Sequence, residues 1–376
     1  MKPQTSSATV RRTCARRPAA PALRPGRPRH AWPLALGALL LPACALAQGG
    51  PAPEGSPREH RGVENVPQIF EQPGVLTPRG GLVIEPSMQY AYSSSNRIAL
   101  VGYTVIPALL IGVIDVREVK RNTYTATMTA RYGLTNRLEL EARVPAVYRQ
   151  DTSIGRRLLG NPPLQDSVVF DASGKDLGDV EATLRYQLND GGADRPYFVG
   201  SLRLKSRTGR DPFQVETTTV AGLGDGVQTT LPTGSGFVGV QPALTMLMAA
   251  DPAVFFGSVS MLYSVKRTDV TRQTPQGPQV IPGTIQPGHI YGFNFGMGMA
   301  INERASFSIG YDHSSVGKTR QNGVAAPDTV RVQLGTLLLG LSFKPTPKRT
   351  LSLTLGAGVT RDTPDVTLTL RVPMSL

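Results

Sequence analysis

The chain has 376 residues, and its 40 lysine and arginine residues against 27 aspartate and glutamate residues give a formal charge of +13 at pH 7. The first 47 residues hold eight of the basic residues, no acidic residue, both cysteines and the single tryptophan. The remainder has 32 basic and 27 acidic residues, so its charge does not indicate a nucleic-acid-binding protein. Because this remainder contains no cysteine, disulfide scaffolds, thiol enzymes and cysteine zinc sites are excluded for it.

Residues 1–47 have the features of an export signal. An arginine-rich segment that ends at Arg29 is followed by an apolar run over 32–42, and the small-x-small sequence Ala-Leu-Ala at 45–47 suits a signal-peptidase site. The apolar run is too short to cross a membrane as a helix. We therefore predict a cleaved N-terminal signal peptide over 1–47.

The mature chain divides into two regions by composition. Residues 48–81 are rich in proline, glycine and glutamate, which predicts a flexible periplasmic N-terminal extension. From 82 to 376 the sequence alternates between apolar and polar residues, most clearly over 138–149, 180–188 and 365–376. Since successive side chains of a strand point to opposite faces, each of these segments has one apolar and one polar face. An all-β fold over 82–376 follows.

The lengths of the connections distinguish a soluble sandwich from a membrane barrel. Short turns are expected at 134–137, 189–195, 249–252, 302–304 and 344–348, and longer connections lie between them at 152–177, 208–236, 272–288 and 318–329. A transmembrane barrel with short periplasmic turns and long external loops has this alternation, whereas a Greek-key sandwich does not require it. We predict a transmembrane antiparallel β-barrel in the bacterial outer membrane.

The alternation predicts about twelve strands. The stretch 98–113 is either an external loop or a further pair of strands, which would give fourteen, and the parity counted from the C-terminus favours the loop. The predicted strands are 82–93, 113–133, 137–151, 177–189, 195–207, 236–248, 253–271, 288–301, 304–318, 329–344, 349–361 and 365–376.

The two faces of these strands have different chemistry. The proposed lipid face carries Leu202, Leu204, Phe293, Phe295 and Leu353 among others, with Tyr90, Tyr92 and Tyr148 as interfacial aromatics. The opposite face collects charges that would be costly in a dry core and that suit a water-filled lumen. The residues predicted to line the pore are Glu139, Glu141, Arg143, Arg149, Asp179, Glu181, Arg185, Arg203, Lys205, Arg207 and Arg371, with Arg131 and Arg331 on the same face. They either brace the wall as cross-strand ion pairs or select the solute.

The sequence offers little support for catalysis or for a cofactor. His60, His289 and His313 are not at metal-ligand spacing, so no metal site is predicted. His313 and Ser315 would share one face of a strand, where an outer-wall lipase could use such a pair, but a role at the membrane interface is the simpler interpretation. The glycine-rich run 222–226 lacks the strand–turn–helix context of a phosphate-binding loop.

Several motifs resemble those of a known family. The runs at 178–186, 231–236 and 310–315, together with 302–307 and 361–366, are similar to those of outer-membrane β-barrel transporters that carry the label "meta-pathway of phenol degradation". The resemblance covers most of 62–376 and implies a membrane pore or carrier, with no catalytic motif. Barrels of this kind commonly end in Phe or Trp, whereas this chain ends Met374-Ser375-Leu376.

These features predict a porin-like pore that moves a small, aromatic or apolar solute passively across the outer membrane, with the loop 208–236 narrowing the external mouth. The alternatives are an exporter of a secreted polypeptide, with 48–81 as a plug, and a structural or adhesin barrel that transports nothing. The expected partners are outer-membrane lipid, the barrel-assembly machinery and the solute, and a homo-oligomer is left open. No cofactor, enzymatic activity or nucleic-acid partner is expected.

Overall fold

The computed structural model describes residues 76–94, 117–159, 164–192, 195–220, 224–326 and 329–376. The predicted signal peptide, nearly all of the predicted extension and the stretch 98–113 lie outside these residues. The described residues contain strands and no helix, and so no helix long and apolar enough to span a membrane.

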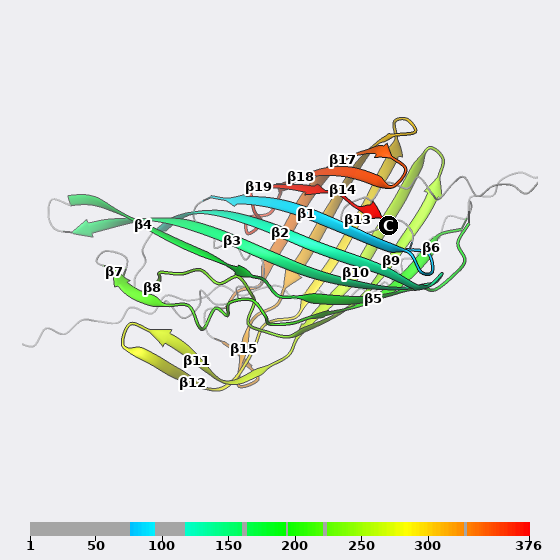
Figure 1. Cartoon of the computed structure of the whole chain (residues 1–376). Helices are drawn as coiled ribbons and strands as arrows, with labels where there is room; N and C mark the ends of the chain where they lie inside the picture. The colour runs from blue at the N-terminus through cyan, green and yellow to red at the C-terminus, as the bar shows by residue number, and fades with distance from the viewer. Residues whose placement is uncertain (1–75, 95–116, 160–163, 193–194, 221–223, 327–328) are drawn as a thin grey trace, which may run out of the picture. The chain divides into compact units, whose positions relative to one another are not determined.

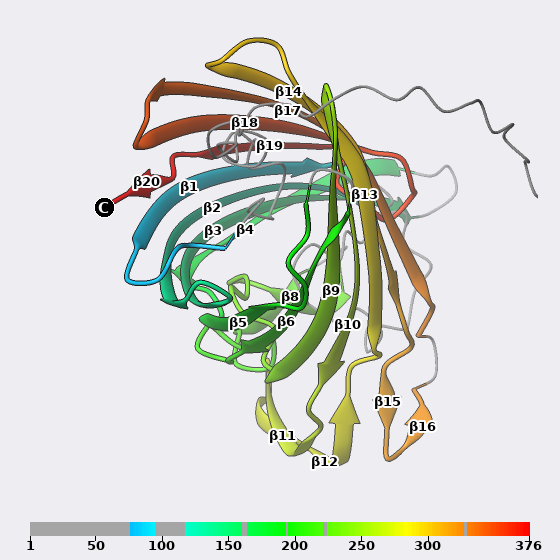
Figure 2. The same cartoon turned by 90° about the vertical axis from the view of Figure 1, so that its right-hand side faces the viewer.

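Twelve strands form a closed antiparallel barrel, as Figures 1 and 2 show. Each strand pairs with its neighbours along the chain, and the last barrel strand pairs with the first through register pairs such as Tyr90 with Leu368. The predicted fold class and the strand count of twelve are thus confirmed. The barrel strands are β1 (Leu82–Ser93), β2 (Arg117–Thr135), β3 (Leu138–Leu159), β5 (Glu181–Gln187), β6 (Tyr197–Lys205), β9 (Gly239–Ala250), β10 (Ala253–Ser264), β13 (Ile290–Ala300), β14 (Ala305–Val316), β17 (Val332–Thr346), β18 (Arg349–Gly358) and β19 (Val366–Arg371).

Further strands extend the barrel at the end opposite its five short turns. This end is external, because outer-membrane barrels have their short turns on the periplasmic side. β4 (Leu164–Leu177) pairs with β3, and its Ser173 forms an isolated bridge with Thr230. β7 (Thr217–Val220) pairs with β8 (Gly224–Gln228). A small separate sheet is formed by β11 (Arg267–Thr274), β12 (Gly277–Gln286), β15 (Arg320–Gln321) and β16 (Val324–Ala325). β20 (Met374–Ser375) follows β19 and pairs with β1 and β18.

The observed boundaries differ from the predicted ones. The predicted strand 177–189 begins only at Glu181, as β5, and the predicted connections 208–236, 272–288 and 318–329 contain strands. Three further differences concern longer segments. The predicted loop 152–177 is largely a hairpin, because β3 continues to Leu159 and β4 pairs with it. The predicted strand 253–271 divides into β10 and β11, which leaves the barrel to pair with β12. The predicted final strand 365–376 is interrupted after β19, where Pro373 has no backbone N–H to donate to the ladder.

The outer surface of the barrel is apolar. Leucine, phenylalanine and methionine side chains on the outward positions are exposed, including Leu202, Phe295, Leu341 and Leu353. Tyr90, Tyr124 and Tyr148 stand side by side on three neighbouring strands near the external end, with ring centroids 5.0 and 6.1 Å apart. Such a belt bounded by tyrosines is what the acyl chains and the interface of a bilayer require. The apolar face predicted from the alternation is therefore the outer face.

Leu353 and Thr354 provide a matched test of the two faces. Leu353 is exposed on the outer face of β18, and Thr354 points inward and lines the lumen. We expect Leu353→Arg to lower the free energy of unfolding in lipid vesicles by about 2–4 kcal/mol, because the charge would lie in hydrocarbon. Thr354→Arg should cost clearly less, since its guanidinium reaches water. Urea titration of both variants measures this difference, and equal costs would contradict the assignment of the faces.

Candidate functional site

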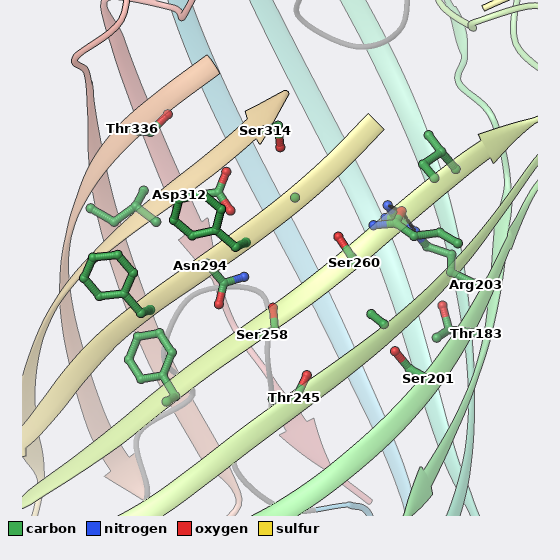
Figure 3. A pocket seen from close by; sticks show the side chains of 18 of the residues that line it. Thr183, Ser201, Arg203, Thr245, Ser258, Ser260, Asn294, Asp312, Ser314 and Thr336 are labelled. Carbon is green, nitrogen blue, oxygen red and sulfur yellow. Dashed lines mark hydrogen bonds between the residues drawn. The ribbon is translucent and has the colours of Figure 1, made fainter. Parts of the chain in front are cut away.

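The candidate site is a cavity of about 460 Å³ inside the barrel. Residues from every barrel strand except β2 line it. Figure 3 labels ten of them, from β5, β6, β9, β10, β13, β14 and β17. The lining is of two kinds. The charged wall, formed by β3, β5 and β6, carries arginine and glutamate side chains, and Arg371 lies apart from it on β19. The other wall, from β9 to β18, carries hydroxyl, amide and aliphatic groups and the carboxylate of Asp312.

The charged wall is a ladder of ion pairs between neighbouring strands. Arg185 pairs with Glu139 (Nη1 to Oε1, 3.1 Å) and with Glu141 (Nη2 to Oε2, 2.9 Å). Glu181 accepts from Arg203 at 3.1 Å and lies 3.7 Å from Arg143. The cross-strand ion pairs expected from the sequence therefore form, and they offset part of the cost of placing these charges inside a protein.

The second wall contains residues that the sequence reasoning did not single out as functional. Ser258, Asn294, Asp312 and Thr336 occupy consecutive positions across β10, β13, β14 and β17, because register pairs join each to the next. Figure 3 shows their side chains pointing into the cavity. The period-two pattern placed these positions on the inner face, but small polar residues on a strand do not by themselves indicate a lumen wall.

Aliphatic and aromatic side chains interrupt this polar wall. Phe256 and Leu247 pack together with Tyr197 near the periplasmic end, and Leu262, Leu334 and Leu338 also line the cavity. A Cβ atom on Gly296 would lie 2.4 Å from the Phe256 ring, so this inward glycine leaves room for the ring.

The chain enters β1 from inside the barrel. Leu76 lines the cavity, and the backbone N–H of Thr77 donates to Glu139 Oε2 at 2.7 Å. A Cβ atom on Gly133 would lie 2.1 Å from the carbonyl oxygen of Pro78, so β2 needs glycine where the segment 76–81 crosses it. This segment occupies part of the periplasmic half of the lumen.

The long connection 206–238 folds onto inward side chains of the barrel. The Asp179 carboxylate anchors it by accepting hydrogen bonds from Gly209 N (3.2 Å), Ser235 N (2.9 Å) and Ser235 Oγ (2.6 Å). Lys205 Nζ lies 3.0 Å from the same carboxylate, and Arg149 Nη1 donates to Pro232 O at 2.9 Å. Three residues predicted to line the pore, Arg149, Asp179 and Lys205, therefore hold a loop in place.

The same connection completes the barrel wall between the end of β4 and the start of β5. Residues 178–180 belong to no strand, and Thr208 serves both sides of this interruption: its Oγ1 donates to Gly178 O and accepts from Val180 N, each at 2.9 Å. Thr233 Oγ1 donates to Leu177 O at 2.7 Å. Loop side chains thus satisfy backbone groups that no neighbouring strand satisfies.

On its external side the connection is held by the small sheet. Arg267 pairs with Asp211, donates from Nη1 to Gly236 O at 2.9 Å and lies over the Phe213 ring at 5.5 Å. Phe213 and Phe237 form a buried cluster with Val270 of β11 and Ile285 of β12. The loop is therefore fixed both to the barrel, through Asp179, and to the external sheet, through Arg267.

The predicted pore-lining residues fall into four groups. Glu141, Arg143, Arg185, Arg203 and Arg371 line the cavity. Glu139 and Glu181 pair with arginines of the ladder but do not belong to the cavity lining. Arg149, Asp179 and Lys205 contact the loop, and Arg207 is exposed just after β6. Arg131, on the same face, pairs with Glu85, and Arg331 is exposed just before β17.

The histidine and serine on β14 do not form a nucleophile–base pair. His313 bonds to Tyr311 through Nδ1 and to Gln333 through Nε2, each at 3.0 Å, and Gln333 Nε2 donates to Ser315 Oγ at 2.9 Å. Gln333 therefore separates His313 from Ser315. Within the part of the chain that the structure describes, no group of three or more His, Cys, Asp or Glu side chains could hold a metal ion.

Comparison with known proteins gives a structural class. No protein-family model matches the chain. Among solved structures it is similar to the COG4313 outer membrane channel from Pseudomonas putida F1, with 16% identity, a TM-score of 0.54 and coverage of 81% of this chain and 99% of that one. It is also similar to the β domain of the Bordetella autotransporter BrkA (12%, 0.40, 79% and 100%) and to the CymD monoaromatic hydrocarbon channel (10%, 0.36, 79% and 88%). At these identities the likeness concerns the fold, which is that of an outer-membrane β-barrel.

The Asp179 anchor can be tested by substitution. We expect Asp179→Asn to leave the Lys205 ammonium buried without its counter-ion, which costs about 3 kcal/mol or more for a buried pair. The loop 206–238 should then detach from the wall, and trypsin should cleave after Arg207 and Arg210 faster than in the parent protein. Asp190→Asn, which breaks the exposed pair with Arg137 at a periplasmic turn, is the control and should cleave at the parental rate. Unchanged cleavage in Asp179→Asn would contradict the anchoring role.

Proposed function

We propose that this chain forms a passive pore of the bacterial outer membrane that moves a small, aromatic or apolar solute. The observation that carries the proposal is the cavity of about 460 Å³ inside a closed barrel, because its size is that of a small-molecule site and its lining mixes aliphatic with polar groups. The resemblance of the sequence motifs to the phenol-degradation-labelled transporter family, and of the fold to the COG4313 channel, supports the same assignment.

The proposed mechanism needs no chemical step. A solute enters at the external end past the loop 206–238, crosses the cavity between the charged and the polar wall, and leaves past the segment 76–81. The charged residues predicted from the sequence would then have two roles. Glu141, Arg143, Arg185, Arg203 and Arg371 contact the solute, and Glu139, Arg149, Asp179, Glu181 and Lys205 keep the wall and the loop in place. Export through the predicted signal peptide 1–47 and insertion by the barrel-assembly machinery belong to the same proposal.

The polypeptide-export alternative has less support. An exporter needs a wide lumen, and here the segment 76–81 crosses the lumen wall with Gly133 and Glu139 as fixed contacts. A scaffold that transports nothing would have no use for a lining that leaves a cavity of this size.

Two adjacent positions on β13 test transport. Asn294 points into the cavity, and Phe295 is exposed on the outer face. We expect Asn294→Trp to reduce single-channel conductance in planar bilayers, and uptake of a small aromatic solute by liposomes, several-fold, because the indole occupies the solute path. Phe295→Trp places the same group in lipid and should leave both values unchanged. A parent protein with no conductance and no solute uptake would refute the proposal, as would equal effects of the two variants.

A further inference from the structure

The outer face of β1 to β4, which lie side by side in Figure 1, has a hollow in its apolar belt. One register row of outward residues crosses the four strands and consists of Met88, Ala126, Ala146 and Leu177. Met88 and Leu177 are large and exposed, whereas the two alanines between them have only a methyl group each. They leave a space of about 440 Å³ on the lipid side of the wall, which we call the outer hollow.

A row of tyrosines and one lysine bounds the outer hollow on its external side. The next outward positions of the four strands are occupied, in register order, by Tyr90, Tyr124, Tyr148 and Lys175. Tyr148 lies about 34 Å along β3 from Leu138 at the periplasmic turn, or about 25 Å along the membrane normal at the usual strand tilt. Since this is the height of the apolar band of such barrels, the row lies at the outer interface of the bilayer.

Lys175 carries a charge that the protein does not neutralise. Among the described residues it has no ion-pair or hydrogen-bond partner. The adjacent carboxylate of Asp176, which also borders the outer hollow, accepts from Leu177 N at 2.9 Å and lies 3.5 Å from Arg210 Nη2, so it already has a cation. The Lys175 ammonium group is therefore a positive charge at the depth of lipid headgroups, beside an apolar space.

Polar side chains occupy the next outward row towards the external medium. This row consists of Asn122, Gln150 and Ser173. Gln150 and Ser173 are exposed, and Asn122 Oδ1 accepts from Tyr90 Oη at 2.9 Å. From the membrane core outwards, the surface thus changes from small apolar groups to an ammonium group beside tyrosines, and then to amide and hydroxyl groups.

We infer that the outer hollow binds one glycolipid of the outer leaflet that carries phosphate on its sugar. An acyl chain lies over Ala126 and Ala146, the phosphate pairs with Lys175, and sugar hydroxyl groups bond to Gln150 and Ser173. The order of the three rows supports this occupant, because acyl chain, sugar-bound phosphate and sugar hydroxyl groups follow one another in such a lipid from the membrane core outwards. A phospholipid with a small headgroup would leave the outermost row without a partner. The inference concerns the outer wall and does not depend on transport through the lumen.

Three lipids separate the contributions: lipid A, lipid A without its phosphate groups, and phosphatidylglycerol. Binding is measured by native mass spectrometry of the mature chain released from detergent micelles. We expect one molecule of lipid A to bind about fivefold more tightly than the dephosphorylated form, because a lysine near a lipid phosphate contributes about 1 kcal/mol. Phosphatidylglycerol, which has the phosphate but no phosphorylated sugar, should also bind more weakly than lipid A.

Variants locate the site. Ala126→Trp fills the outer hollow and should weaken the binding of lipid A about tenfold. Ala142→Trp is the control, because Ala142 is outward between Ala130 and Ala182 but outside the hollow, and it should leave binding unchanged. Lys175→Gln should remove the preference for phosphorylated lipid A, and Lys175→Arg should keep it. Heat-modifiable migration on a gel identifies folded variants, and the two Lys175 variants decide the matter if Ala126→Trp does not fold.

The contrary results are distinct. Equal binding of phosphorylated and dephosphorylated lipid A would overturn the inference, as would phosphatidylglycerol that binds as tightly as lipid A. Equal effects of Ala126→Trp and Ala142→Trp would also overturn it, because the lipid would then bind elsewhere on the outer face. Each of these results leaves the proposed pore intact, since conductance and solute uptake are measured separately.

Discussion

The constraint on which the structure depends is that every backbone polar group inside a bilayer must be hydrogen-bonded within the protein. The twelve barrel strands meet it by closing on themselves, so that no barrel strand is left as an edge for its full length. Where the strand is interrupted, at residues 178–180, the hydroxyl group of Thr208 from the long connection bonds to the backbone of this stretch, and that of Thr233 donates to Leu177 O just before it. The connection 206–238 is therefore also part of the wall.

Closure separates two environments, lipid outside the barrel and water inside it, and the polarity of the side chains on each face matches its environment. Outward positions are apolar because they meet acyl chains, and the charges collect inside, where they pair across strands and reach water. Two of these charges also have structural roles that the lining of a pore would not require. Asp179 anchors the loop, and Glu139 accepts a hydrogen bond from the backbone N–H of Thr77. The arginines of the ladder remain more exposed than the glutamates with which they pair.

The alternation of apolar and polar residues was sufficient to predict the barrel, its twelve strands and the direction of each face, because a period of two and a strict order of short and long connections leave few other folds. It could not predict which segments leave the barrel. The prediction joined β10 and the first part of β11 in one strand, 253–271. The contact of Arg267 with Asp211 and the pairing of β11 with β12 show that the chain has turned away from the barrel there. The residues that anchor the loop could not be predicted either, because Asp179 is far in the sequence from Gly209 and Ser235 and contacts them only in the folded chain.

Placement of Ser258, Asn294 and Thr336 on the inner face followed from the pattern. Their role as the second wall of the cavity could not be predicted, because it depends on which strands lie opposite one another.

The measurement that tests the account most directly locates two adjacent residues of β10, inward Ser258 and outward Val259. The chain after residue 47 has no tryptophan, so Ser258→Trp and Val259→Trp each introduce a single fluorophore. In vesicles, brominated lipid should quench the tryptophan at 259 strongly and the tryptophan at 258 weakly. The reverse order, or equal quenching at both positions, would show that the polar face of the strands does not enclose the lumen.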